Sequence, residues 1–92
     1  MNFKELDEVI SVGTVLTEPV FNTLIEFSNY NSNGMRVTVT KALTTLKERI
    51  DRGDKITFYK TGQVFDVYSF RNMVYNTFGE QMFESVTGIE MN

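Results

Sequence analysis

Apolar and polar residues alternate along this chain at spacings that predict several helices and a few short strands. Over residues 3–10, Phe3, Leu6 and Ile10 share one side of a helix, and acidic residues occupy the other. The stretch 9–16 is rich in β-branched residues and fits either the end of this helix or a first strand. Whether residues 9–16 are strand or helix is therefore left open.

A second helix of roughly three turns is predicted to begin after Thr17, a residue type favoured at the N-cap. Glu18 and Pro19 suit its first turn, where a missing N–H costs nothing and negative charge meets the helix dipole. An apolar stripe follows with the helical period: Val20, Phe21, Leu24, Ile25 and Phe27. Residues 29–34, Asn-Tyr-Asn-Ser-Asn-Gly, have turn chemistry throughout.

The next segment predicts a strand and then a helix. Residues 35–40, Met-Arg-Val-Thr-Val-Thr, alternate strictly between apolar and polar side chains, as a half-buried strand does. A helix over residues 41–52 follows, and Gly53 suits its left-handed C-terminal cap. The inward positions of this helix are Leu43, Leu46 and Ile50.

Residues 55–60 and 63–68 are predicted to pair around a Thr-Gly turn as a β-hairpin. Ser69 can cap a last helix, which Gly79 divides in two in an alternative interpretation. The apolar positions of that helix are Phe70, Met73, Val74, Phe78, Met82, Phe83 and Val86.

Together these elements predict a small α+β fold in a single globular domain over residues 1–92. We expect a three- or four-stranded, mainly antiparallel sheet packed with about three helices. Residues 34–68 would form a winged-like strand–helix–hairpin module. That module is basic, because residues 35–73 carry eight basic and four acidic side chains, a net charge of +4 in a chain of net charge −3. Acidic residues interleave with basic ones along helix 41–52, so a plain solvated face is the favoured explanation of this pattern.

The residue types that are missing exclude much chemistry. The chain has no His and no Cys, which excludes the usual zinc and iron sites, His-based triads and disulfides. Glu48, Asp51 and Asp54 are better explained by salt bridges to neighbouring Lys and Arg than as a cation site. We therefore expect no enzyme activity, no metal and no cofactor. No membrane span and no signal peptide are evident, which makes the cytoplasm the expected location.

Part of the basic module resembles a known DNA-binding domain. Residues 34–37, Gly-Met-Arg-Val, the amphipathic helix and residues 60–67, Lys-Thr-Gly-Gln-Val-Phe-Asp-Val, are similar to the double-wing domain of T-even phage middle-promoter activators. The resemblance covers about a third of the chain. Residues 1–33 do not match, since that family has strands where this chain has the helix after Thr17. It implies a phage origin and DNA contacts from a basic helix and a wing.

Two functions follow from these features. The favoured one is a small non-enzymatic interaction protein, such as a phage-type early protein, that binds a host macromolecule and modulates or inhibits it by occupancy. Its partner would be a protein, because Tyr and Arg are favoured anchors of protein interfaces. The alternative is a winged-helix-like or double-wing DNA-binding transcription regulator, although a sequence pI near 4.8 opposes phosphate binding. The candidate binding residues are Arg36, Lys41, Lys47, Arg49, Arg52, Lys60, Tyr59 and Tyr68.

Overall fold

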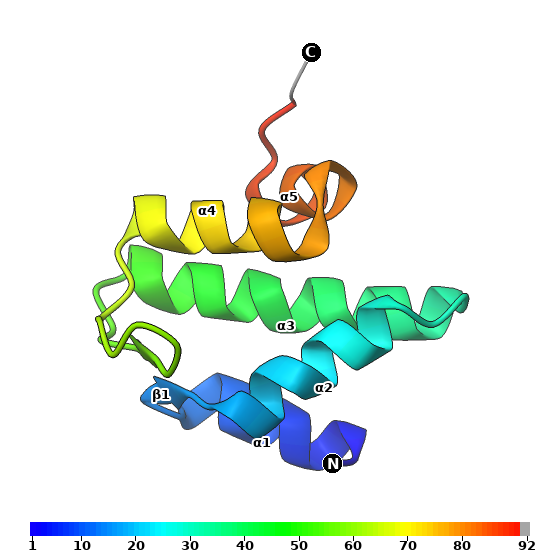
Figure 1. The fold of residues 1–92 in the computed structure, drawn as a ribbon, viewed down its shortest axis with the longest axis horizontal. Helices are drawn as coiled ribbons and strands as arrows, with labels where there is room; N and C mark the ends of the chain where they lie inside the picture. Colours follow the sequence, from blue (N-terminus) through cyan, green and yellow to red (C-terminus); the bar gives the residue numbers. More distant parts are fainter. Residues whose placement is uncertain (91–92) are drawn as a thin grey trace.

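The computed structural model describes residues 1–90, and helices make up most of them (Figure 1). The elements in chain order are α1 (Phe3–Val12), β1 (Val15–Leu16), α2 (Glu18–Ser28), α3 (Asn33–Asp51), β2 (Thr57–Phe58), α4 (Val67–Phe78) and α5 (Glu80–Thr87). Helix α3 is the longest and runs through the middle of the molecule (Figure 1). Helices α1 and α2 lie on one side of it, and α4 and α5 lie on the other.

The hydrophobic core surrounds α3, which contacts all four of the other helices. Val39 and Leu43 of α3 are fully buried and belong to the same cluster as Leu24 of α2 and Phe70 of α4. Each such side chain contributes about 1.5–3 kcal/mol when it leaves water. Helix α3 thus holds the two outer layers of the fold together.

The predicted α+β fold, with its three- or four-stranded antiparallel sheet, is wrong. Within residues 1–90 the only sheet has two strands of two residues each, and they pair in parallel. Val15 lies opposite Thr57 and Leu16 opposite Phe58, so the sheet joins the α1–α2 connection to the chain after α3. A sheet this small cannot form a layer, and the helices supply the packing instead.

Residues 35–40 form the first half of α3, so the predicted strand is wrong. In a helix, Met35 and Val39 lie on the same side, one turn apart, whereas Val37 points to the other side. Val39 is fully buried, whereas Val37 is 64% exposed. The hydroxyls of Thr38 and Thr40 donate to carbonyls four residues earlier, a bond that a helix offers to these side chains.

The two long strands of the predicted hairpin are wrong, and with them the winged-like module, because the antiparallel part is a short turn in which Phe58 N–H donates to Gln63 and Phe65 N–H to Ile56. Only Thr57–Phe58 is a strand in this region, and its antiparallel pairing is a single bridge from Thr57 to Val64. Residues 63–68 do not continue as a strand, because α4 begins at Val67. Asp66 is the N-cap, and the Ser69 N–H donates to its carboxylate at 2.7 Å. Ser69 is therefore the partner in a capping box, not the cap that we predicted.

Several other predictions are confirmed. Helix α2 begins directly after Thr17, with Pro in its first turn, although the Thr17 side chain makes no capping hydrogen bond. The open segment 9–16 divides between the two alternatives, since it contains both the end of α1 and strand β1. Gly53 follows α3 with φ +98°, and Gly79 separates α4 from α5 with φ +94°. Both backbone conformations favour glycine.

Over residues 1–90, no helix combines the length and apolar character that crossing a membrane requires.

Candidate functional site

Arg49, one of the predicted basic residues, is not a surface residue. Its side chain is buried at 6% exposure, between α3 and the end of α1. One guanidinium nitrogen donates to the carbonyls of Ile10 and Gly13, at 2.9 and 2.7 Å, and Nε donates to Asp54 at 3.1 Å. Arg49 therefore satisfies the carbonyls at the C-terminal end of α1 and holds that helix on α3.

Three further candidates are engaged within the molecule. Lys47 pairs with Asp51 at 2.7 Å, one turn along α3. Arg52 pairs with Asp54 at 2.9 Å. Hydrogen bonds from Arg52 and from Arg49 keep the pKa of the Asp54 carboxyl below its usual value. The Lys60 amine lies 5.4 Å from the centre of a phenylalanine ring in α2, which is a cation–π contact.

Arg36 and Lys41 are exposed, but they line different hollows. Arg36 lies beside α5, in a polar pocket of about 190 Å³ that also contains Gln81 and Ser85. Lys41 lies in a groove between α1 and α3. Of the six basic candidates, one is thus buried, three contact groups within the molecule, and Arg36 and Lys41 line separate hollows.

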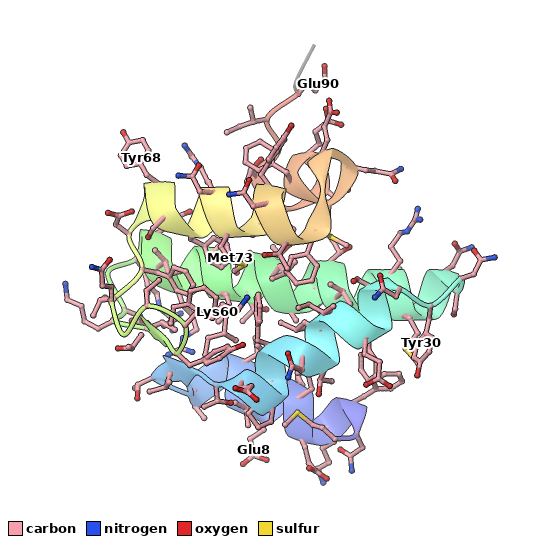
Figure 2. The ribbon with its side chains drawn as sticks, in the orientation of Figure 1. Glu8, Tyr30, Lys60, Tyr68, Met73 and Glu90 are labelled. Carbon is pink, nitrogen blue, oxygen red and sulfur yellow. The ribbon has the colours of Figure 1, made fainter. Side chains whose placement is uncertain are left out.

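The two tyrosine candidates have different environments. Tyr59 is half-buried, and its ring packs edge-on against Phe21 and Phe58, so it covers the core. Tyr68 is 75% exposed and points away from the molecule at the start of α4 (Figure 2). Within residues 1–90 its side chain makes no hydrogen bond or ring contact. Of the two predicted tyrosines, Tyr68 is therefore the one whose side chain is open to solvent.

The outer surface of α4 around Tyr68 is rich in Tyr and Asn. Asn72 lies four residues after Tyr68, and Tyr75 and Asn76 lie three and four residues after Asn72. These helical spacings place the side chains of Tyr68, Asn72, Tyr75 and Asn76 on one side of α4. Every one of them is exposed, and the ring of Tyr75 also meets Phe83 of α5 at 5.8 Å. We call this surface the α4 face: Tyr68, Asn72, Tyr75 and Asn76.

The α4 face stands on a well-fixed helix. The capping box of Asp66 and Ser69 closes the first turn immediately beside Tyr68. On the opposite side of α4, Phe70 and Val74 are buried against the core at 1% and 0% exposure. A rigid helix presents its exposed rings in a defined arrangement, which lowers the entropy lost on binding.

Arg71 borders the α4 face and was not among the predicted binding residues. Its side chain is half-buried, and its Nε is buried without a hydrogen-bond partner in residues 1–90. Sequence reasoning also missed Asn72, Tyr75 and Asn76 as a group. Their spacing places them beside Tyr68 only when residues 67–78 form one helix, whereas the predicted hairpin placed Tyr68 in a strand.

In the part of the chain that the structure describes, no three His, Cys, Asp or Glu side chains gather as metal ligands would. Comparison of the chain with protein-family models, curated proteins and solved structures found no match. The geometry of its own residues is therefore the basis for a functional proposal.

Proposed function

We propose that this chain is a non-enzymatic interaction protein that binds a protein partner through the α4 face and modulates that partner by occupancy. One observation carries the proposal. Tyr68, exposed at 75% on a helix whose other side is fixed in the core, lies on a surface of Tyr and Asn that Arg71 borders. Neither a reaction nor a cofactor is needed for such a role.

The composition of the α4 face matches what protein recognition requires. Tyrosine provides a large, rigid contact area with few rotatable bonds, and asparagine provides hydrogen bonds that adapt to the partner. Charged residues are depleted at the centres of protein interfaces, and the α4 face has none. Arg71 at its border adds a residue type that is often an energetic anchor.

The same composition argues against nucleic acid as the partner of this face. Phosphate binding depends on several Lys and Arg side chains acting together, and α4 carries only Arg71. The double-wing resemblance offers no support either, because the wing it requires is absent from residues 55–68. We place the activity in the cytoplasm, in keeping with a chain that has no cysteine for disulfides.

The α4 face is the centre of an interface and not its whole extent. Residues 68–76 cover about 12 Å of helix, at 1.5 Å per residue. A stable interface buries about 800 Å² on each partner, which requires surface beyond one helix. Helix α5 and residues 88–90 continue the same side of the molecule, where Ile89 is 39% exposed (Figure 1).

The test compares two exposed tyrosines at opposite ends of the molecule (Figure 2). The tagged chain is used to capture partners from cell extract treated with nuclease, and the dissociation constant is then measured with the purified partner. We expect Tyr68→Ala to weaken binding by about 2 kcal/mol, a factor of roughly 30. Tyr30→Ala is the matched control, since Tyr30 is 47% exposed and lies far from α4.

Two results would contradict the proposal. In one, Tyr68→Ala and Tyr30→Ala change the dissociation constant equally. In the other, the partner disappears with nuclease treatment, which would make it a nucleic acid.

A further inference from the structure

A second surface with its own chemistry lies between α1 and α3, as a groove of about 320 Å³. Leu6 of α1 and Ala42 of α3 line it and are buried at 1% and 7% exposure. Phe3 and Val37 also line it and remain 51% and 64% exposed, although both are apolar. The side chain of Ala42 is small, which leaves room between the two helices. The groove is therefore apolar and open to solvent.

Two lysines border this apolar groove, one from each helix. Lys4 comes from α1 and Lys41 from α3, and both side chains line the groove. Within residues 1–90 neither amine makes an ion pair or a hydrogen bond, in contrast to Lys47. Asp7 is the only acidic side chain of the lining, so the lining carries a net charge of +1.

The exposed Phe3 wall of the groove rests on a buried aromatic ring. The Phe3 ring meets the ring of Phe27 edge-on at 5.5 Å, and Phe27 is itself buried at 9% exposure. Phe27 is at the end of α2, so a third helix supports this wall of the groove.

We propose that the α1–α3 groove binds a short acidic segment of a partner protein. One aromatic or branched aliphatic side chain of the segment enters between Phe3 and Val37, and carboxylates on either side approach Lys4 and Lys41. The charge of the groove selects an acidic segment over a basic one. The site is separate from the α4 face, because α1 and α4 lie on opposite sides of α3 (Figure 1).

Size and polarity favour a peptide segment over other acidic molecules. A volume of 320 Å³ is at the lower end of the range for ligand pockets, which suits one side chain better than a long acyl chain. A nucleic acid would place its phosphates over an apolar floor with only two lysines, which is a poor match.

The experiment uses a pentapeptide with a central phenylalanine and two aspartates on each side. It is titrated into the isotope-labelled full chain, and backbone amide chemical shifts are recorded. We expect changes at residues 3–7 and 37–42, and none along α4. A peptide with lysines in place of aspartates, and one with alanine in place of phenylalanine, should each bind at least about fivefold more weakly.

Exposed positions provide variants that keep the fold. Lys41→Glu reverses one charge of the groove, and Val37→Glu places a carboxylate in its apolar wall. Each should weaken binding of the acidic peptide at least about fivefold. Lys55→Glu changes the net charge by the same amount at an exposed lysine outside the groove, and should have little effect. Amide spectra of the free variants verify that the fold is unchanged.

Any of three outcomes overturns the proposal. The acidic peptide changes amide chemical shifts outside residues 3–7 and 37–42, the lysine peptide binds as tightly as the acidic peptide, or Lys55→Glu weakens binding as much as Lys41→Glu does. Stronger binding of decanoate or of a short DNA duplex to the same residues would overturn it as well. Tyr68→Ala should leave peptide binding unchanged, so failure of the α4 face and failure of the groove are distinguishable.

Discussion

Arg49 shows how one residue can be misplaced when only its type is known. In a helix with interleaved charges, an arginine is normally a surface residue, and we predicted it as a binding residue on that basis. The structure buries it, with two carbonyls of the α1 end and one carboxylate as partners. Its spacing was the available signal, because Arg49 lies three residues after Leu46 and next to Ile50, on the buried side of α3.

Replacing Arg49 with methionine should destabilise the protein by about 3 kcal/mol. The change preserves much of the apolar stem but leaves the carbonyls of Ile10 and Gly13 without their donor, and such buried groups are costly. Denaturant unfolding measures the effect. Lys47→Ala is the control and should cost less than about 1 kcal/mol, since its ion pair is near the surface. Equal losses would mean that Arg49 is not a structural clamp.

At the scale of elements, the sequence predicted α1 and α2 because their apolar residues follow the helical period, and it offered the division at Gly79 as an alternative. Residues 35–40 were different, because a strand-like alternation coincided with the first turns of a longer helix. The helical signal was also present: Met35, Val39, Leu43, Leu46 and Ile50 recur every three or four residues through the whole of α3. Contacts with α1, α2 and α5, which the local pattern does not contain, favour the helix.

Truncation of two valines distinguishes by experiment between a helix and a strand over residues 35–40. In a strand, Val37 and Val39 would face the same side and cost the same when truncated. In α3, Val39→Ala should destabilise by about 2 kcal/mol, because the side chain is fully buried. Val37→Ala should change stability by less than about 0.5 kcal/mol. Unfolding midpoints in denaturant give both values. A similar loss of stability in the two variants would support a strand over residues 35–40.

The capping box of α4 predicts that the free energy of unfolding falls as the pH is lowered into the acid range. The Ser69 N–H, and then its hydroxyl, keep the pKa of the Asp66 carboxyl below the ordinary value of 3.8. A depressed pKa in the folded state means that the ionised carboxylate stabilises the fold. That contribution is complete above the ordinary pKa and is lost as the pH falls through the lower, folded value.

Asp66→Asn should therefore lessen the fall in stability as the pH is lowered into this range. Asparagine caps helices about as well as aspartate, so the helix itself should persist at neutral pH. Unfolding midpoints recorded from neutral to acid pH test the change, and the same curve for both proteins would assign the acid sensitivity to other groups. The pKa of Asp54 is also lowered, so Asp54 should still contribute to the pH dependence of stability in the Asp66→Asn variant.

At the scale of the whole molecule, the sequence indicated which residues are apolar and where charge concentrates, but not how the layers assemble. The eight basic residues of the segment 35–73 are close in sequence, and proximity in sequence suggested a common surface. Helix α3 turns Arg36 and Lys41 toward different neighbours, while Arg49 enters the core. The α4 face was hidden for the same reason, because it depends on a helix that was predicted to begin three residues later.

This dispersal of charge leads to the last prediction, that the protein does not bind duplex DNA tightly. Each phosphate neutralised contributes roughly −0.9 to the slope of log affinity against log salt, and a basic surface of four or five cations would give about −4. Here Lys47 and Arg52 are paired with carboxylates, Arg49 is buried, and the net charge of the chain is −3. Fluorescence anisotropy with a labelled duplex should show weak binding and a slope shallower than about −2. Sub-micromolar, sequence-dependent binding near physiological salt would show that the cations act together after all, and Arg36 and Lys41 would then be the first positions to substitute.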